Sequence, residues 1–280
     1  MKISPKHFPP ISIFCQKKLT FDFTPIEPTE RQMRVFDKML CALIIEGRKN
    51  IFTLSNSIQN LLGPNREKLM DAFWKDPQKE SFSGAYIETQ MTVPSIELFN
   101  FIPLHQENPK TGVEEDSLRY IFASVQGNNV VVSIGIIDLF YEGNGDYLLL
   151  PHISTVNTEE REQEIINCQN YMLYLLNACT FLKYADVEVI NVYGHQRKML
   201  PDKSDVIENK SGVRVQYIDS RWIREIIRLE GFKVRGHFRL QPIKDEEGEW
   251  TRKLIYINEF EKHGYHRRAL KMLENNTELQ

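Results

Sequence analysis

The sequence has few cysteines and no long apolar segment. Four of its 280 residues are Cys and none forms a C-x-x-C pair, a pattern typical of free thiols in a reducing compartment. The longest apolar stretch, 130–140, is interrupted by Ser133 and Asp138 and is shorter than the roughly 20 residues that span a bilayer. The run at 11–14 is too short for a signal-peptide core. We therefore expect a cytoplasmic protein without membrane contact.

The common catalytic fingerprints are also missing. The sequence contains no P-loop, no G-x-S-x-G and no H-E-x-x-H motif, which argues against the enzyme classes that carry them. The glycines at 143 and 145 form a G-x-G, but they lie in an expected hairpin turn without a following helix. This is turn chemistry rather than a dinucleotide site. The sequence predicts no cofactor.

One stretch resembles the P-D…E-x-K spacing of metal-dependent nucleases. It comprises Asp202, Glu208 and Lys210. Such nucleases hold Mg²⁺ with acids on paired strands, whereas these acids are six residues apart in an expected loop. A metal-dependent nuclease stays a third hypothesis, which undiminished activity in EDTA would exclude.

Charge is unevenly distributed along the chain. Apolar residues make up 41% and charged residues 26%, as in ordinary soluble domains. The net charge of -3 conceals 17 Lys and Arg against 24 Asp and Glu in residues 1–195, and 18 against 12 in residues 196–271. The basic C-terminal third predicts a surface that binds a polyanion.

Periodicity predicts an α+β fold with a central antiparallel sheet, flanking helices and a helical N-terminal part. Thr29 and Gln32 form a capping box before an apolar helical period over 30–46, and helices are also expected at 57–76, 158–181 and 220–230. Strands separated by turn residues form a meander, which favours antiparallel pairing; they are expected at 85–93, 118–126, 130–141, 147–150 and 186–192. Residues 103–117 and 194–215 are expected to be loops.

We expect two parts in the chain. Residues 1–80 form an N-terminal arm with helices, and residues 81–280 form a mixed core with a basic C-terminal hairpin. Tyr171 and Tyr174 fit packing on a helix. His105 and His152 are isolated in the sequence, which fits surface positions better than ligand positions.

The C-terminal hairpin carries the most informative pattern. In strand 232–241, apolar and polar residues alternate, so Lys233, Arg235, His237 and Arg239 share one face. If Ile255 and Ile257 form the core face of the returning strand, Arg252 and Tyr256 join the polar face. Arg235, His237, Arg239, Arg252 and Tyr256 would then form one cluster.

This cluster has the composition of a phosphate-binding site. Arginine forks bind phosphate oxygens bidentately, and we assign RNA or phosphate binding to Lys233, Arg235, Arg239 and Arg252. Neighbouring cations favour the neutral form of His237, which could accept the proton of an RNA 2′-hydroxyl. Tyr256 would assist the leaving group, giving a ribonuclease that needs no metal. The alternative is a solvated basic face with a structural role.

The same residues suggest a family. Val234–Arg239 and the later segment 252–257 read V-R-G-H-F-R and R-K-L-I-Y-I. They resemble the R-G-H-[WF]-R…R-x-[IVL]-W-[IV] ending of proteins encoded on mobile elements, among them the translation-dependent type V-A anti-CRISPR inhibitors. The resemblance covers about a third of the chain. Tyr256 stands where the family prefers Trp, and the hairpin tip is acidic where the family has Gly and basic residues.

The resemblance implies a regulator that lowers a target messenger RNA during translation. Messenger RNA is then the expected partner, with a nascent peptide or the ribosome as further partners. The alternative hypothesis is a non-enzymatic binding protein that sequesters a protein or nascent peptide, with the hairpin purely structural.

Overall fold

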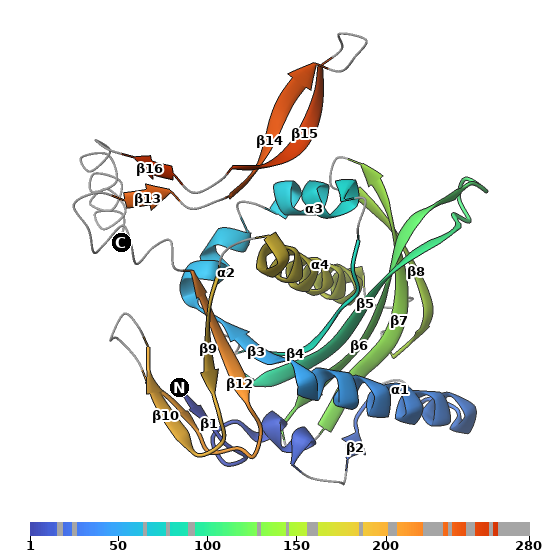
Figure 1. The fold of residues 1–280 in the computed structure, drawn as a ribbon. Helices are drawn as coiled ribbons and strands as arrows, with labels where there is room; N and C mark the ends of the chain where they lie inside the picture. Colours follow the sequence, from blue (N-terminus) through green and yellow to red (C-terminus); the bar gives the residue numbers. More distant parts are fainter. Residues whose placement is uncertain are drawn as a thin grey trace.

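A large, strongly curved sheet organises the molecule. The computed structural model describes residues 1–15, 19–23, 27–63, 66–76, 79–88, 93–127, 130–143, 146–155, 162–184, 187–200, 206–220, 232–234, 237–244, 250–257 and 260–262. In sheet order the nine strands are β2 (Thr20–Phe21), β7 (Val130–Gly143), β6 (Glu114–Gln126), β5 (Ser95–Glu107), β4 (Phe82–Glu88), β3 (Ile51–Leu54), β12 (Val215–Ser220) and β9 (Val187–Val192), with β8 (Asp146–Ser154) paired to β7. Figure 1 shows this sheet curling around helix α4 (Glu162–Tyr184).

Strand pairing in this sheet is mixed. Strands β4 to β8 form an antiparallel meander. Strand β3, in contrast, pairs in parallel with both β4 and β12, and β2 pairs in parallel with β7. The parallel partners are far apart in sequence, so long connections join them.

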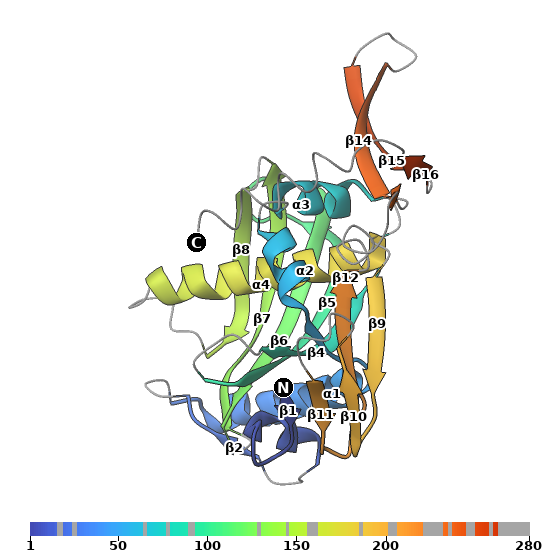
Figure 2. The same cartoon turned by 90° about the vertical axis from the view of Figure 1, so that its left-hand side faces the viewer.

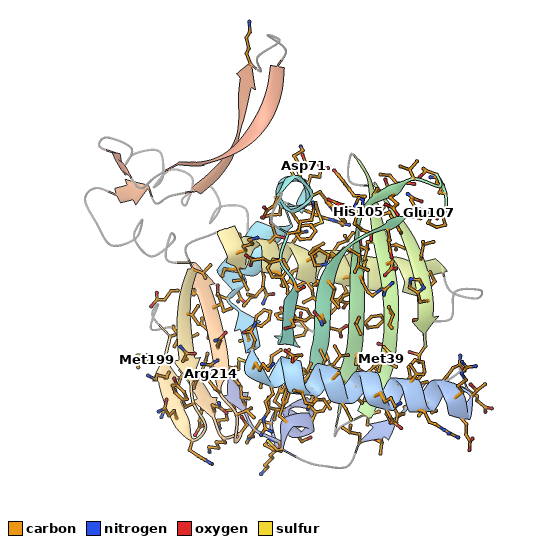
Figure 3. All side chains as sticks on the ribbon, turned by 45° about the vertical axis from the view of Figure 1, so that its right-hand side comes forward. Met39, Asp71, His105, Glu107, Met199 and Arg214 are labelled. Carbon is orange, nitrogen blue, oxygen red and sulfur yellow. The ribbon has the colours of Figure 1, made fainter. Side chains whose placement is uncertain are left out.

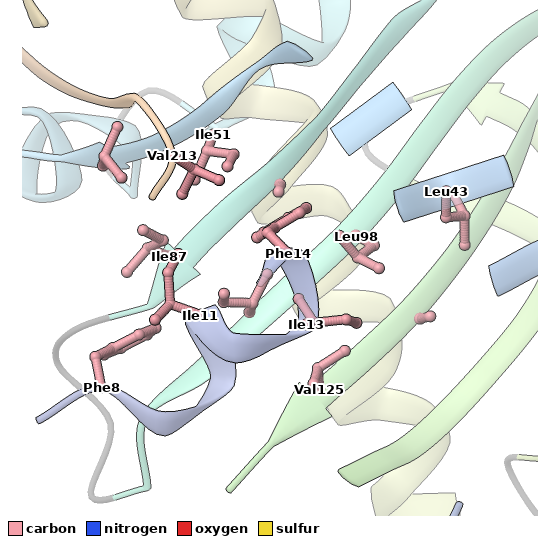
Figure 4. Close-up of a cluster of buried hydrophobic side chains, with 14 of the residues drawn as sticks. Phe8, Ile11, Ile13, Phe14, Leu43, Ile51, Ile87, Leu98, Val125 and Val213 are labelled. Carbon is pink, nitrogen blue, oxygen red and sulfur yellow. The ribbon is translucent and has the colours of Figure 1, made fainter. Parts of the chain in front are cut away.

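The sheet buries both of its faces. On β5, Leu98 belongs to a core with the 3₁₀ helix η1 (Pro9–Phe14) and helix α1 (Glu30–Lys49). The next residue, Phe99, belongs to a second core with α2 (Asn56–Leu62), α3 (Arg66–Lys75) and α4. Alternation of side chains along each strand separates the two cores. Figure 4 shows the first core, in which Ile11 and Phe14 of η1 lie near Leu98.

Helix α1 confirms the expected capping box. The Thr29 side chain accepts from the backbone N–H of Gln32, and the Gln32 side chain accepts from the backbone N–H of Thr29. Its buried residues, Phe36, Leu40 and Leu43, follow helical spacing.

The predicted α+β class with a helical N-terminal part is wrong. Strands hold more of the described residues than helices do, in a sheet of nine strands. The chain begins with strand β1 (Lys2–Ile3), which pairs in parallel with β11 (Val206–Asn209), and β3 adds a further early strand. Sequence reasoning missed these strands because they are short and their partners lie far along the chain. The division at residue 80 stays a prediction.

Both predicted loops also contain strands. Strands β5 and β6 continue to Glu107 and from Glu114, where polar residues replace the apolar alternation. There the side chains pair with one another across strands, and the polarity of the sequence suggested a loop. Residues 196–199 form β10 (Gln196–Met199), which pairs with β11 in a three-stranded sheet. The helix expected at 220–230 falls mostly outside the described residues.

Two smaller strand pairs follow. Strand β13 (Phe232–Val234) pairs with β16 (Phe260–Lys262), and β14 (His237–Lys244) pairs with β15 (Trp250–Ile257). Figures 1 and 2 both show the β14–β15 hairpin extending away from the large sheet. Within the described ranges, no helix has the length and apolar character to cross a membrane.

The turn between β9 and β10 depends on a glycine. A Cβ added to Gly194 would lie 2.6 Å from the backbone oxygen of Ser211, so Gly194→Ala must displace backbone. We expect a loss of about 1–3 kcal/mol in the free energy of unfolding, measured by denaturant titration. The matched control is Gly212→Ala, because no described atom lies within 4 Å of its Cβ position. Equal stability of the two variants would contradict this packing.

Candidate functional site

The hairpin register determines which candidate residues share a face. His237 pairs with Ile257, Phe238 with Tyr256, and Arg239 with Ile255. Farther along, Gln241 pairs with Lys253 and Pro242 with Arg252. Because directly paired residues of antiparallel strands lie on the same face, His237, Arg239 and Lys253 share one face.

Arg252 and Tyr256 therefore lie on the other face, with Phe238 and Pro242. From the sequence, we expected Arg252 and Tyr256 to share a face with His237 and Arg239. The observed register does not give this common face. The expected alignment was off by one residue, and a shift of one residue moves a whole strand to the opposite face. The proposed roles of His237 and Tyr256 in catalysis stay predictions, but the two residues are no longer neighbours on one face.

Two hairpin candidates remain. Lys233 is in β13, and its register partner on β16 is Glu261. Arg235 lies outside the described residues. His237, Arg239 and Lys253 thus form the basic face of the hairpin.

A second polar cluster lies on β5 to β8 of the large sheet. Asp138 of β7 is buried, with 1% of its surface exposed. Arg119 Nε donates to its Oδ1 at 2.8 Å, Arg119 Nη2 to its Oδ2 at 2.8 Å, and Gln106 Nε2 to its Oδ2 at 2.9 Å. His152 Nε2 lies 2.6 Å from the same Oδ2. One carboxylate thus joins side chains from β5, β6 and β8.

Electrostatics fix the protonation of this cluster. Burial by itself raises the pKa of Asp138, but hydrogen bonds from Arg119, Gln106 and His152 outweigh it and lower the pKa to about 2. The carboxylate is then ionised and only accepts hydrogen bonds, so His152 must carry its proton on Nε2. The cluster ties four strands together.

His105 has a related environment at the end of β5. Its Nδ1 lies 3.1 Å from Asp116 Oδ1, and Lys79 Nζ donates to Asp116 Oδ2 at 2.7 Å. Hydrogen bonds from Lys79 and His105 lower the pKa of Asp116. Figure 3 shows His105 and Glu107 at the end of the sheet far from α1. Both isolated histidines of the sequence are thus paired with aspartates, and both are exposed, as expected for surface positions.

The segment of the metal-nuclease hypothesis does not form a site among the described residues. Glu208 lies on β11, and Lys210 Nζ donates to its Oε1 at 3.1 Å. Asp202 lies outside the described residues. Where the structure is described, no group of three or more His, Cys, Asp or Glu side chains is arranged to hold a metal ion.

Sequence reasoning missed the Asp138 cluster as a unit. Its signal was a charged residue within the apolar run 130–140, because a charge in a buried strand requires partners. The partners are separated from Asp138 by 14 to 32 residues, and no local pattern links them.

Comparisons with protein-family models, curated proteins and solved structures find no match to this chain.

Proposed function

We propose that the protein is an RNA-binding regulator that lowers a target messenger RNA, with the basic face of the C-terminal hairpin as its contact surface. The observation that carries the proposal is the β14–β15 register, in which His237, Arg239 and Lys253 share a face. The resemblance of this segment to the endings of translation-dependent anti-CRISPR inhibitors supports the same class.

The charge arrangement supports phosphate as the group that this face binds. Arg239 pairs with Ile255, and Lys253 pairs with Gln241. The two cations therefore lie on neighbouring strands, offset by two residues along the hairpin. Like charges at this separation repel each other, and a phosphate backbone removes the repulsion. The opposite face alternates apolar positions, Phe238, Leu240 and Leu254, with Arg252 and Lys244. We therefore expect the two faces of the hairpin to differ in their contribution to RNA binding.

This difference gives a matched experiment. We expect Arg239→Ala/Lys253→Ala to weaken binding of single-stranded RNA at least tenfold, because two phosphate contacts are lost. Arg252→Ala/Lys244→Ala removes the same charge from the same hairpin and should keep binding within about twofold. Fluorescence anisotropy with a labelled RNA measures both. Equal loss in the two variants would indicate that only net charge matters, and would contradict the proposed face.

Direct RNA cleavage is a separate part of the hypothesis. His237 is the candidate base, and the substitution His237→Gln should abolish loss of the target messenger in cells if cleavage is direct. Tyr256→Phe tests the second assigned residue: messenger loss that is unchanged in this variant would exclude Tyr256 from the cleavage step, since the register places it on the opposite face from His237. Messenger loss that survives His237→Gln would point to a recruited nuclease.

A second function, binding of a protein or nascent peptide, is favoured by strand β10. This strand ends its three-stranded sheet, and all four of its residues are exposed, including Met199 at 64%. An exposed edge strand can accept an extended peptide as an added strand. Replacing Arg197 with Pro would remove one backbone donor from this edge, because its register partner Glu208 directs its own backbone N–H toward β1 rather than toward β10. A partner that is lost from that variant, with RNA binding unchanged, would support the second function.

A further inference from the structure

Strand β10 forms the open edge of the three-stranded sheet. The strand order in this sheet is β1, β11, β10, so β10 has a partner strand on one side only within the described part of the chain. All four of its residues are exposed, and the exposed fraction of Met199 is 64%. Figure 1 shows β10 on the outer side of the molecule. A further strand could therefore pair with β10 without displacing a described residue.

The hydrogen bonds of the middle strand show which backbone groups of β10 point outward. The backbone N–H of Glu208 donates to the carbonyl of Met1 at 3.0 Å, toward β1. In an antiparallel pair, two directly opposite residues either face each other or both face away. Arg197 is opposite Glu208, so its N–H and C=O groups point away from β11. Those of Met199, two residues further on, do the same, and each residue offers one donor and one acceptor to an added strand.

This edge is positively charged on both faces. Arg197 and Lys198 are adjacent, so their side chains lie on opposite faces of the sheet, and β10 contains no acidic residue. Glu208 of β11 lies across from Arg197, but Lys210 Nζ already pairs with its carboxylate at 3.1 Å. On the other side of Glu208, β1 adds Lys2. The three strands therefore carry an excess of cations, which favours a partner with acidic side chains.

We propose that β10 binds an extended acidic peptide as an added strand, a proposal that rests on the second function given above. Backbone pairing with Arg197 and Met199 supplies the main-chain hydrogen bonds. Acidic side chains opposite Arg197 and Lys198 supply one charge pair on each face. Met199 is exposed on the same face as Arg197, so an apolar residue opposite it completes the contact. The expected motif is two adjacent acidic residues followed or preceded by an apolar residue.

Two other occupants match this edge less well. Antiparallel pairing with the β10 of a second copy, through Arg197 and Met199 of both chains, places Lys198 opposite Lys198. Like charges directly opposite each other destabilise a strand pair. RNA carries charge that matches the cations, but it has no peptide backbone to pair with the outward groups of Arg197 and Met199. An acidic peptide matches both the charge and the backbone groups.

The experiment is fluorescence anisotropy of the purified full-length protein with short labelled peptides at low salt. The acidic probes are Thr-Thr-Val-Glu-Glu-Thr-Thr and Thr-Thr-Glu-Glu-Val-Thr-Thr, which allow for both strand directions. Matched peptides carry Gln or Lys in place of both Glu residues. We expect saturable binding of at least one acidic probe, about fivefold weaker binding of its Gln version and no binding of its Lys version.

Variants of β10 separate the contribution of the backbone from that of charge. Met199→Pro removes an outward donor and keeps every charge, whereas Met199→Ala removes the same side chain and keeps the donor. We expect the Pro variant to bind the acidic probe about fivefold more weakly than the Ala variant. Arg197→Gln should weaken binding of the acidic probe about threefold and leave binding of the Gln peptide unchanged. Arg34→Gln, which removes the same charge from an exposed position on α1, should bind like the wild type.

The outcomes distinguish this proposal from the function on which it rests. Equal binding of the Glu and Gln peptides would overturn the acidic preference and leave peptide addition at β10 in place. Absence of binding by every peptide, or equal binding by the Met199→Pro and Met199→Ala proteins, would contradict strand addition itself. A dimer in light scattering that Met199→Pro dissociates would assign the edge to a second copy. Loss of RNA binding in Arg197→Gln but not in Arg34→Gln would assign it to RNA, and either result would overturn the proposal.

Discussion

Replacing Asp138 with Asn is expected to lower the free energy of unfolding by about 3 kcal/mol, the lower end of the range for breaking a buried ion pair. The carboxylate is almost fully buried and accepts from Arg119, Gln106 and His152. An amide cannot neutralise Arg119, and its NH₂ group would face donors where the carboxylate offered an acceptor. The loss stays near the lower end because the Arg119 and His152 side chains are 33% and 49% exposed.

The matched control for this prediction is Asp116→Asn. Asp116 also pairs with a histidine and a cation, but 54% of its side chain is exposed, so its loss should cost less than about 1 kcal/mol. Urea titration at neutral pH measures both variants. An Asp138→Asn protein as stable as the Asp116→Asn protein would show that the cluster does not tie the four strands together.

Replacing Glu97 with Gln is expected to remove a pH-dependent loss of stability. Burial raises the pKa of Glu97 to about 7 in the folded protein, above its value of about 4.3 in an unfolded chain. Between these values the unfolded chain releases a proton that the folded protein retains, so stability falls as pH rises. At about 1.4 kcal/mol per pH unit, the full loss is about 4 kcal/mol, of which about 3 kcal/mol falls between pH 4 and pH 8.

Glutamine keeps the acceptor for the Tyr120 hydroxyl but cannot ionise. The stability of Glu97→Gln relative to the wild type should therefore rise by about 3 kcal/mol between pH 4 and pH 8. Comparing the two proteins cancels the titration of all other groups that they share. A constant difference across this range would mean that Glu97 titrates normally and is not in a dry environment.

Local structure could be predicted where one segment carries its own signal. The Thr29 capping box begins a helix at Glu30, as the sequence indicated. The strands from 114 to 143 were expected in part, because turn residues separate the apolar runs that form them. These features depend on neighbours in sequence.

Long-range pairing could not be predicted in the same way. The parallel pairing of β3 with β12, through Thr53 and Tyr217, joins residues that no local pattern relates. The hairpin shows the same limit at short range. Ile255 and Ile257 read as a core face, but they pair with Arg239 and His237, so apolarity alone gave the wrong alignment.

The most direct test of the proposed function is the salt dependence of RNA binding. For single-stranded RNA, the logarithm of the binding constant falls with the logarithm of salt concentration by about 0.7 for each phosphate contact. Loss of two contacts in Arg239→Ala/Lys253→Ala should flatten this slope by about 1.4, while Arg252→Ala/Lys244→Ala should keep the wild-type slope. The same flattening in both variants, or no RNA binding by the wild type at low salt, would contradict RNA recognition by the basic face of the hairpin.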